Sequence, residues 1–128
     1  MLNKPRVLVV DDDEMVATTT SMILNASGFE SVAAFSGARA LELACTQVFD
    51  VLLTDVIMTP MNGIELAVAF LAIQPDTRVL LTSGTVDAVR TLDALDRCCD
   101  LPLLEKPIAP RDLISRIHNA WTSSVDSV

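Results

Sequence analysis

The feature that most constrains the fold is an alternation of short apolar runs with longer segments of helical periodicity. Strands made of valine and leucine runs are typical of a sheet that is buried on both faces. The predicted strands span residues 6–10, 30–35, 50–54, 78–82 and 101–105. The segments between them are long enough for crossover helices, which join parallel strands. We therefore predict an α/β fold built from five βα units.

Apolar residues at helical spacing identify the helix faces that should pack on the sheet. The predicted helices begin near Glu14, after Ser36-Gly37, shortly before Leu66, near Val86 and at Pro110. Gly28 is expected to end the first helix in a left-handed turn. The expected core positions are, helix by helix, Val16, Ile23 and Leu24; Leu41, Ala44 and Val48; Leu66, Phe70 and Ile73; Ala88, Leu92 and Leu95; Leu113, Ile117 and Trp121.

The 128 residues fit one domain, which we assign to residues 1–122, with 123–128 as a flexible tail or the start of a linker. Seventeen acidic and nine basic side chains give a net charge of −8, which disfavours direct binding of nucleic acid or an anionic membrane. The longest apolar run, 66–73, cannot span a bilayer. The three cysteines lack metal-ligand spacing. We expect a cytoplasmic domain whose partners are proteins or cations.

Polar side chains directly follow four of the five predicted strands. The first strand leads into Asp11 and Asp12, and the third into Asp55. The fourth ends in Thr82, and the fifth leads into Lys106. Because chemistry in an open parallel sheet collects beyond the carboxyl ends of its strands, we expect three carboxylates, one hydroxyl and one ammonium to meet at one edge.

Four acids in a row, from Asp11 to Glu14, have no basic residue among them. Carboxylates about 4 Å apart repel each other by several kcal/mol, and a hard cation such as Mg²⁺ would convert this repulsion into binding energy. One carboxylate could then attack phosphorus while the cation and an ammonium neutralise the phosphoryl oxygens. The set predicts aspartyl phosphorylation. Asp13 and Glu14 fit the other use of acids, at the N-terminus of a helix.

These residues stand in motifs that resemble the response regulator receiver domain, the CheY-like phosphoacceptor module of two-component signalling. The resemblance runs from about Arg6 to Trp121 and rests on VLVVDDDE, LLTDVIMTPMNGIEL, VLLTSG and LLEKPI. It implies a three-layer α/β/α sandwich with a five-stranded parallel sheet in the flavodoxin-like order 2-1-3-4-5. It also implies a signalling domain and not an enzyme, although one that assists its own phosphorylation and dephosphorylation.

By this resemblance Asp55 accepts a phosphoryl group from a sensor histidine kinase or a phosphotransfer protein. Lys106 would pair with the phosphoryl oxygens, and Thr82 would swing toward them to report phosphorylation. The implied Mg²⁺ ligands are Asp55, Asp12, Asp11 through water, and the backbone carbonyl of Ile57. The loaded domain would bind a downstream effector protein or a fused output domain, and a homodimer could form through the face made by the fourth helix, fifth strand and fifth helix.

Three positions depart from the family pattern. Proline comes one position late in Met58-Thr59-Pro60, which bears on the conformation of that loop and not on the chemistry. Leu103 stands where an aromatic switch residue is usual, so we expect weaker coupling of Thr82 to the surface. Ile57 replaces a residue that is polar in many relatives and is expected to hinder hydrolysis of the acyl phosphate. The Lys106-Pro107 bond resembles the family's cis peptide.

Two other functions stay open on the sequence alone. A haloacid dehalogenase-like phosphohydrolase also places acids after its first strand, and Asp11-Asp12-Asp13 supplies a D-x-D. Met15, however, stands where that pattern has threonine or valine, and Asp55 would have no role. The other alternative is a receiver-like interaction module that is never phosphorylated, although every residue of the acidic pocket is present.

Overall fold

The structure, a computed structural model, describes residues 4–84 and 103–126. The elements in these residues are β1 (Arg6–Val10), α1 (Glu14–Ala26), β2 (Glu30–Ala34), α2 (Gly37–Ala44), β3 (Val51–Asp55), α3 (Gly63–Ile73), β4 (Arg78–Ser83), β5 (Leu103–Glu105) and α5 (Pro110–Asp126). The predicted strands agree with these bounds to within one residue, apart from 101 and 102 of the fifth. Those two residues and the predicted helix near Val86 lie outside the described residues.

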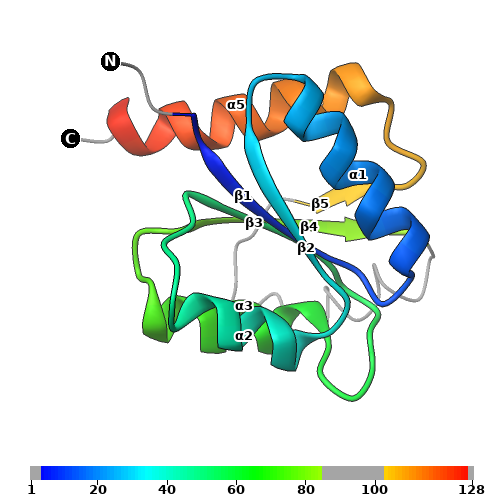
Figure 1. The fold of residues 1–128 in the computed structure, drawn as a ribbon, viewed down its shortest axis with the longest axis vertical. Coiled ribbons are helices and arrows are strands. Elements are labelled where there is room, and N and C mark those ends of the chain that lie inside the picture. Colours follow the sequence, from blue (N-terminus) through cyan, green and yellow to red (C-terminus); the bar gives the residue numbers. More distant parts are fainter. Residues whose placement is uncertain (1–3, 85–102, 127–128) are drawn as a thin grey trace.

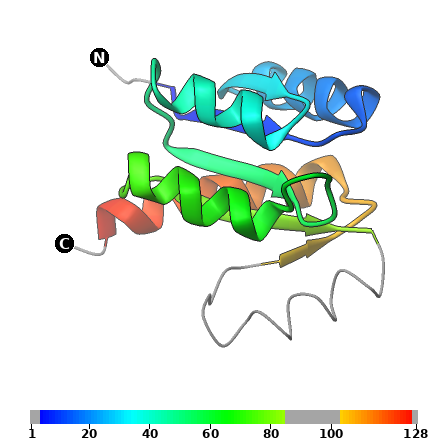
Figure 2. The same cartoon turned by 90° about the horizontal axis from the view of Figure 1, so that it is seen from below.

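The five strands form one parallel sheet in the order β2-β1-β3-β4-β5, which confirms the predicted topology. Figure 1 shows α1 and α5 on one face of the sheet and α2 and α3 on the other, so the fold is a three-layer sandwich. Figure 2 shows the α2 and α3 side, with β5 at the edge of the sheet. The register pairs Val10 with Thr54 and Asp55 with Thr82, so the central strands end level with one another.

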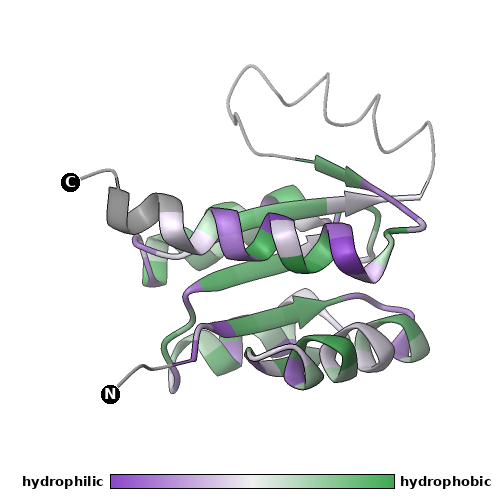
Figure 3. Cartoon of the chain, turned by 90° about the horizontal axis from the view of Figure 1, so that it is seen from above, coloured by the Kyte–Doolittle hydropathy of each residue, from purple (hydrophilic) through white to green (hydrophobic). Residues whose placement is uncertain are grey.

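The sheet separates two hydrophobic clusters, because alternate residues of each strand point to opposite faces. In β1, Leu8 and Val10 pack toward α2 and α3, whereas Val7 and Val9 pack toward α1 and α5. Figure 3 shows the central strands as almost continuous hydrophobic ribbons between helices of mixed character. Full burial of such a side chain stabilises the fold by about 1.5–3 kcal/mol. The two clusters thus hold the central strands in place from both sides.

Most of the predicted helix faces are confirmed. Leu24, Ala44, Leu66, Phe70, Leu113 and Ile117 are buried. Three predicted core positions are wrong: two lie at or beyond the last residue of a helix, and one lies next to the buried position of a first turn. Val48 lies beyond the end of α2 and is 72% exposed, and Ile73, the last residue of α3, is 43% exposed. Val16 is exposed in the first turn of α1, where Ala17 takes the buried position.

Side chains and one glycine fix the helix ends. Asp13, Ser36 and Asn62 are the N-cap residues of α1, α2 and α3, and each accepts hydrogen bonds from amides of the following turn. Gly28 has φ of 99°, which confirms the predicted left-handed turn after α1. The turns that lead into α1, α2 and α3 at the carboxyl edge of the sheet are therefore held by their own side chains.

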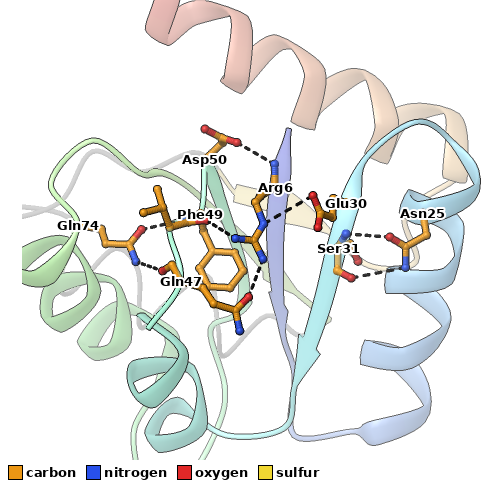
Figure 4. Close-up of polar contacts among 9 residues, drawn as sticks. Arg6, Asn25, Glu30, Ser31, Gln47, Phe49, Asp50 and Gln74 are labelled. Atoms are coloured by element: carbon orange, nitrogen blue, oxygen red, sulfur yellow. Dashed lines mark hydrogen bonds and ion pairs between the residues drawn. The ribbon is translucent and has the colours of Figure 1, made fainter. Parts of the chain in front are cut away.

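A polar cluster holds the opposite edge of the sheet, where the strands begin (Figure 4). Gln74 at the end of α3 donates through Nε2 to the carbonyl oxygens of Ala44 (2.9 Å) and Gln47 (2.5 Å). Its Oε1 accepts from the Phe49 amide at 2.9 Å. Arg6 donates to Gln47 Oε1 at 2.6 Å, and its guanidinium lies 5.2 Å from the centre of the Phe49 ring. These contacts tie the loop before β3 to α3 and β1.

The outer edge of the sheet at β2 is covered locally by a side chain of α1. Asn25 Oδ1 accepts from the Ser31 amide at 2.8 Å, and Asn25 Nδ2 donates to the Ser31 carbonyl at 3.5 Å (Figure 4). The Ser31 hydroxyl is also hydrogen-bonded to the Ser21 hydroxyl. Asn25 thus satisfies both backbone groups that a neighbouring strand would otherwise pair with at this residue.

Candidate functional site

The predicted polar residues meet at the carboxyl edge of the sheet. Asp11 and Asp12 follow β1, Asp55 is the last residue of β3, Thr82 lies in β4 and Lys106 follows β5. One carboxylate oxygen of each aspartate lies within 4.8 Å of the other two. Side chains from four separate segments therefore share one site, as the positions of the strand ends predicted.

Lys106 bridges two of the three carboxylates. Its Nζ lies 2.6 Å from Asp11 Oδ2 and 3.4 Å from Asp55 Oδ2. Asp11 is only 4% exposed, and a carboxylate buried to this degree needs a partner of opposite charge. One ammonium against three carboxylates leaves these four side chains with a formal charge of −2 when all are ionised. The site is short of positive charge.

The pKa values of Asp55 and Lys106 are shifted in directions that reflect the excess of negative charge in the site. Burial raises the pKa of Asp55 above its ordinary value of 3.8, and the charges of Asp11 and Asp12 act in the same direction, whereas Lys106 opposes them. Burial lowers the pKa of Lys106, but the hydrogen bond and charge of Asp11, together with the charge of Asp55, outweigh it, so this pKa is raised. Lys106 therefore stays protonated, and ionising Asp55 costs more free energy than ionising an aspartate in water.

The turn between β1 and α1 positions the two neighbouring acids. The Asp13 amide donates to Asp11 Oδ1 at 3.0 Å. Asp13 Oδ1 accepts in turn from the amides of Met15 (3.1 Å) and Val16 (3.3 Å). The prediction that Asp13 and the following acid serve the helix N-terminus is confirmed, since Asp13 caps α1 and Glu14 lies in its first turn.

Gly63 lets the start of α3 pack against the backbone of Asp55. A Cβ at this position would lie 2.1 Å from the Asp55 carbonyl oxygen. The Gly63 amide donates to the Val56 carbonyl at 2.8 Å. The φ of Gly63 is not in the left-handed region. Among the glycines of the described residues, only Gly28 has such a φ. Gly63 is therefore required for close approach and not for an unusual φ.

The remaining predicted positions surround the site. Thr82 is buried beside Asp55 in the sheet register, and Ile57 lies two residues after Asp55 with 45% of its surface exposed. Leu103 is half-buried and packs against the cluster under α2 and α3. The Lys106-Pro107 peptide is cis, as predicted, and so is Thr59-Pro60, which the sequence reasoning missed.

A cavity of about 570 Å³ leads to the site between α1 and the loop that joins β5 to α5. Asp11, Thr82 and Lys106 form its polar end. Its other walls are mostly apolar and include Val9, Leu53, Ile23, Ile108 and Leu113. Met15, at the start of α1, is 78% exposed where the cavity opens. The sequence analysis placed Ile23 and Leu113 in the core and did not find this access route.

Comparison with known proteins gives the family. Residues 7–118 match the sequence model of the family described as "Response regulator receiver domain". The chain belongs to this family. The receiver domain is 32% identical over 113 residues to the response regulator receiver protein CpdR of Brucella abortus, an alignment that covers 88% of this chain and 93% of CpdR. It is also 32% identical over 116 residues to the transcriptional regulatory protein PrrA of Mycobacterium tuberculosis, of which it spans 49%.

Solved structures agree with this assignment. The receiver domain superposes on a CheY-like receiver domain of Methanospirillum hungatei with a TM-score of 0.86 at 25% identity, covering 98% of this chain and all of the other. The chemotaxis protein CheY4 of Vibrio cholerae gives a TM-score of 0.81 at 26% identity, with 92% of this chain and 99% of CheY4 covered. The chain is thus a phosphoacceptor receiver domain of two-component systems, and nothing in these matches supports the phosphohydrolase alternative. No helix within the described residues combines the length and apolar character needed to cross a membrane.

Proposed function

We propose that Asp55 accepts a phosphoryl group from the phosphohistidine of a sensor histidine kinase or phosphotransfer protein. The phosphorylated domain is then recognised by a downstream effector or a fused output domain. The observation that carries this proposal is the position of Asp55 at the end of β3. Its carboxylate has an oxygen within 4.8 Å of oxygens of Asp11 and Asp12, and its Oδ2 lies 3.4 Å from Lys106 Nζ. A nucleophilic oxygen and a charge-neutralising donor are already side by side.

The transfer needs little movement of these side chains. An oxygen of ionised Asp55 donates an electron pair to phosphorus, the phosphorus–nitrogen bond breaks, and its electron pair stays on the departing imidazole nitrogen. Lys106 donates hydrogen bonds to the phosphoryl oxygens, since its ammonium already lies 3.4 Å from Asp55. Thr82, whose backbone pairs with that of Asp55 in the sheet, swings its hydroxyl toward the phosphoryl group and donates another. Donors aimed at developing charge are the main source of catalysis in this class of reaction.

The donor set of the site fits Mg²⁺. Three carboxylates that can gather oxygens within 4.8 Å are hard ligands, and their shared negative charge exceeds what Lys106 neutralises. We propose that Asp12, Asp55 and the Ile57 carbonyl hold the ion directly and that Asp11 does so through water. Bound there, Mg²⁺ supplies positive charge to the phosphoryl oxygens.

Phosphorylation by acetyl phosphate with Mg²⁺ tests the proposal. Intact-protein mass spectrometry should show one added phosphoryl group, stable in acid and lost in base, and Asp55→Asn should abolish it. Asp76→Asn is the matched control because Asp76 is an exposed acid in the loop before β4, at the opposite edge of the sheet. Uptake that persists in Asp55→Asn would overturn the assignment. No uptake in the wild type from acetyl phosphate or phosphoramidate would favour the unphosphorylated interaction module.

The cavity beside α1 suits a phosphodonor protein. Its apolar walls end at Asp11, Thr82 and Lys106, so a partner that buries Met15 would stand next to the acceptor. We expect Met15→Asp to slow transfer from a protein donor and to leave transfer from acetyl phosphate unchanged. Equal slowing with both donors would indicate damage to the site itself.

Two departures from the family pattern lead to proposals about signal output. Ile57, exposed beside the acceptor, hinders the attacking water, so Ile57→Asn should shorten the phosphoryl lifetime, and an unchanged lifetime would contradict this. Leu103 packs on the core and offers no polar ring edge to solvent, so it couples Thr82 weakly to the surface. The predicted homodimer through the fourth helix, β5 and α5 stays a prediction, because that helix lies outside the described residues.

A further inference from the structure

Both oxygens of the buried Asp11 carboxylate have partners from different parts of the chain. Oδ2 receives the Lys106 ammonium at 2.6 Å, and Oδ1 receives the backbone amide of Asp13 at 3.0 Å. The first partner comes from the end of β5, and the second from the turn that Asp11 itself begins. The orientation of Asp11 therefore depends on where the Asp13 amide stands.

The Asp13 side chain determines the position of that amide. Its Oδ1 accepts from the amides of Met15 and Val16, and the residue has the extended backbone of an N-cap, with φ −82° and ψ 103°. The first amides of a helix have no partner within the helix. Removing the acceptor leaves the amides of Met15 and Val16 to water, so the first turn of α1 loosens and the Asp13 amide is no longer fixed against Asp11.

The turn also decides whether two consecutive acids can serve one cation. Successive side chains of an extended strand point in opposite directions. Asp11 and Asp12 nevertheless place an oxygen each within 4.8 Å of an Asp55 oxygen, which is possible because the chain turns immediately after Val10. A fixed turn at 11–13 is thus a condition for the three-carboxylate site.

We infer that Asp13 is a positioning residue for the cation site. It binds no ion itself; its side chain fixes the start of α1, and the start of α1 fixes the turn that carries Asp11 and Asp12. This inference rests on the proposed function, because Asp11, Asp12 and Asp55 are the expected Mg²⁺ ligands. A competing explanation for any effect of Asp13 is its negative charge, which attracts a cation without positioning anything.

Four substitutions separate positioning from charge. Asp13→Asn, Asp13→Ser, Asp13→Thr and Asp13→Ala all remove the charge, but their quality as N-caps falls in the order Asn and Ser, then Thr, then Ala. If Asp13 positions the site, Mg²⁺ affinity follows this order. If only its charge matters, the four variants bind Mg²⁺ equally. Glu14→Ala is the matched control, because it removes an exposed charge one residue along and leaves the cap intact.

Mg²⁺ affinity is measured by following backbone amide shifts in a titration with the metal alone, with urea unfolding in parallel. We expect Asp13→Asn and Asp13→Ser to bind within about threefold of each other, and Asp13→Ala to bind about tenfold more weakly, the low end for residues that orient metal ligands. Equal affinities across the series overturn the inference and leave the proposed function standing. A wild-type protein that does not bind Mg²⁺ overturns both. If Asp13→Ala does not fold, the comparison of Asp13→Asn with Asp13→Thr decides.

Discussion

The substitution Gly63→Ala tests how closely α3 must approach the acceptor. A methyl group at Gly63 would lie 2.1 Å from the Asp55 carbonyl oxygen and 3.0 Å from Val56 Cα, whereas ordinary contacts begin at 3.4 Å. The atoms in the way belong to the backbone at the end of β3, which is paired with β4 up to Thr82. No change of side-chain rotamer can relieve this overlap, so Asp55 or the first turn of α3 must move.

Gly37→Ala is the matched control, because Gly37 is the first residue of α2 as Gly63 is of α3. Its added methyl group would meet the Met61 side chain at 2.8 Å, and methionine can change rotamer. Overpacking against backbone costs about 1–3 kcal/mol, and loss of the Gly63 amide hydrogen bond adds about 1 kcal/mol. In both variants, alanine also restricts the unfolded chain more than glycine does, which adds about 0.4–1 kcal/mol of stability. We expect Gly63→Ala to lose about 2–3 kcal/mol and Gly37→Ala to stay within about 1 kcal/mol of wild type.

Urea unfolding measures the difference. With a slope of about 1–3 kcal/mol per molar urea, Gly63→Ala should unfold at a midpoint about 1 M below that of Gly37→Ala. Phosphoryl uptake from acetyl phosphate should also fall in Gly63→Ala under conditions where it is fully folded, because the overlap pushes the start of α3 and the end of β3, which carries Asp55, apart; uptake should persist in Gly37→Ala. Equal midpoints for the two variants would refute the reasoning, since a real overlap with backbone cannot be relieved as cheaply as one with Met61.

Three further predictions concern stability and local structure. Because burial and the neighbouring acids raise the pKa of Asp55, its ionisation destabilises the fold, so Asp55→Asn should be more stable than wild type in Mg²⁺-free buffer at neutral pH. This gain in stability should shrink as the pH falls through the raised pKa of Asp55 toward 3.8, because the carboxyl group is then protonated in the wild type. A gain in urea midpoint that is the same at every pH would contradict the prediction. Gln74→Ala should cost about 2–4 kcal/mol in urea unfolding, because it removes partners from two carbonyls and an amide of the α2–β3 region; a loss under about 1 kcal/mol would mean that water replaces them. Asn25→Ala should speed hydrogen exchange of the Ser31 amide, and an unchanged rate would show that Asn25 does not protect the edge.

The sheet could be predicted from sequence because parallel strands buried on both faces leave a strong signal. Stretches such as residues 7–10 and 79–81 are apolar throughout, and the crossover rule then restricts the order of the strands. The helix faces were harder, since periodicity does not show where a helix stops. Val48 continued the pattern of α2 but lies beyond its last residue, Ala44, in the loop that Gln74 ties down. Gln74 lies at the end of α3, 27 or more residues along the chain, so no local sequence pattern reports its contacts with this loop.

For the site, the sequence predicts which residues come together but not how closely the backbone holds them. Asp55, Thr82 and Lys106 could be placed together from sequence, because each adjoins the carboxyl end of a strand and the register sets those ends level. The functions proposed for Asp13 and Gly63 depend instead on close approaches of the backbone. The Asp13 amide lies 3.0 Å from Asp11 Oδ1, and a Cβ on Gly63 would lie 2.1 Å from the Asp55 carbonyl oxygen. From the sequence, Asp13 was one more acid at a helix start, and Gly63 was one residue of the motif LLTDVIMTPMNGIEL. The strand ends supply the side chains that we propose for phosphoryl transfer, and Asp13 and Gly63 hold the backbone that carries them. Precise positioning matters because a displacement of about 1 Å can slow such a reaction about a hundredfold.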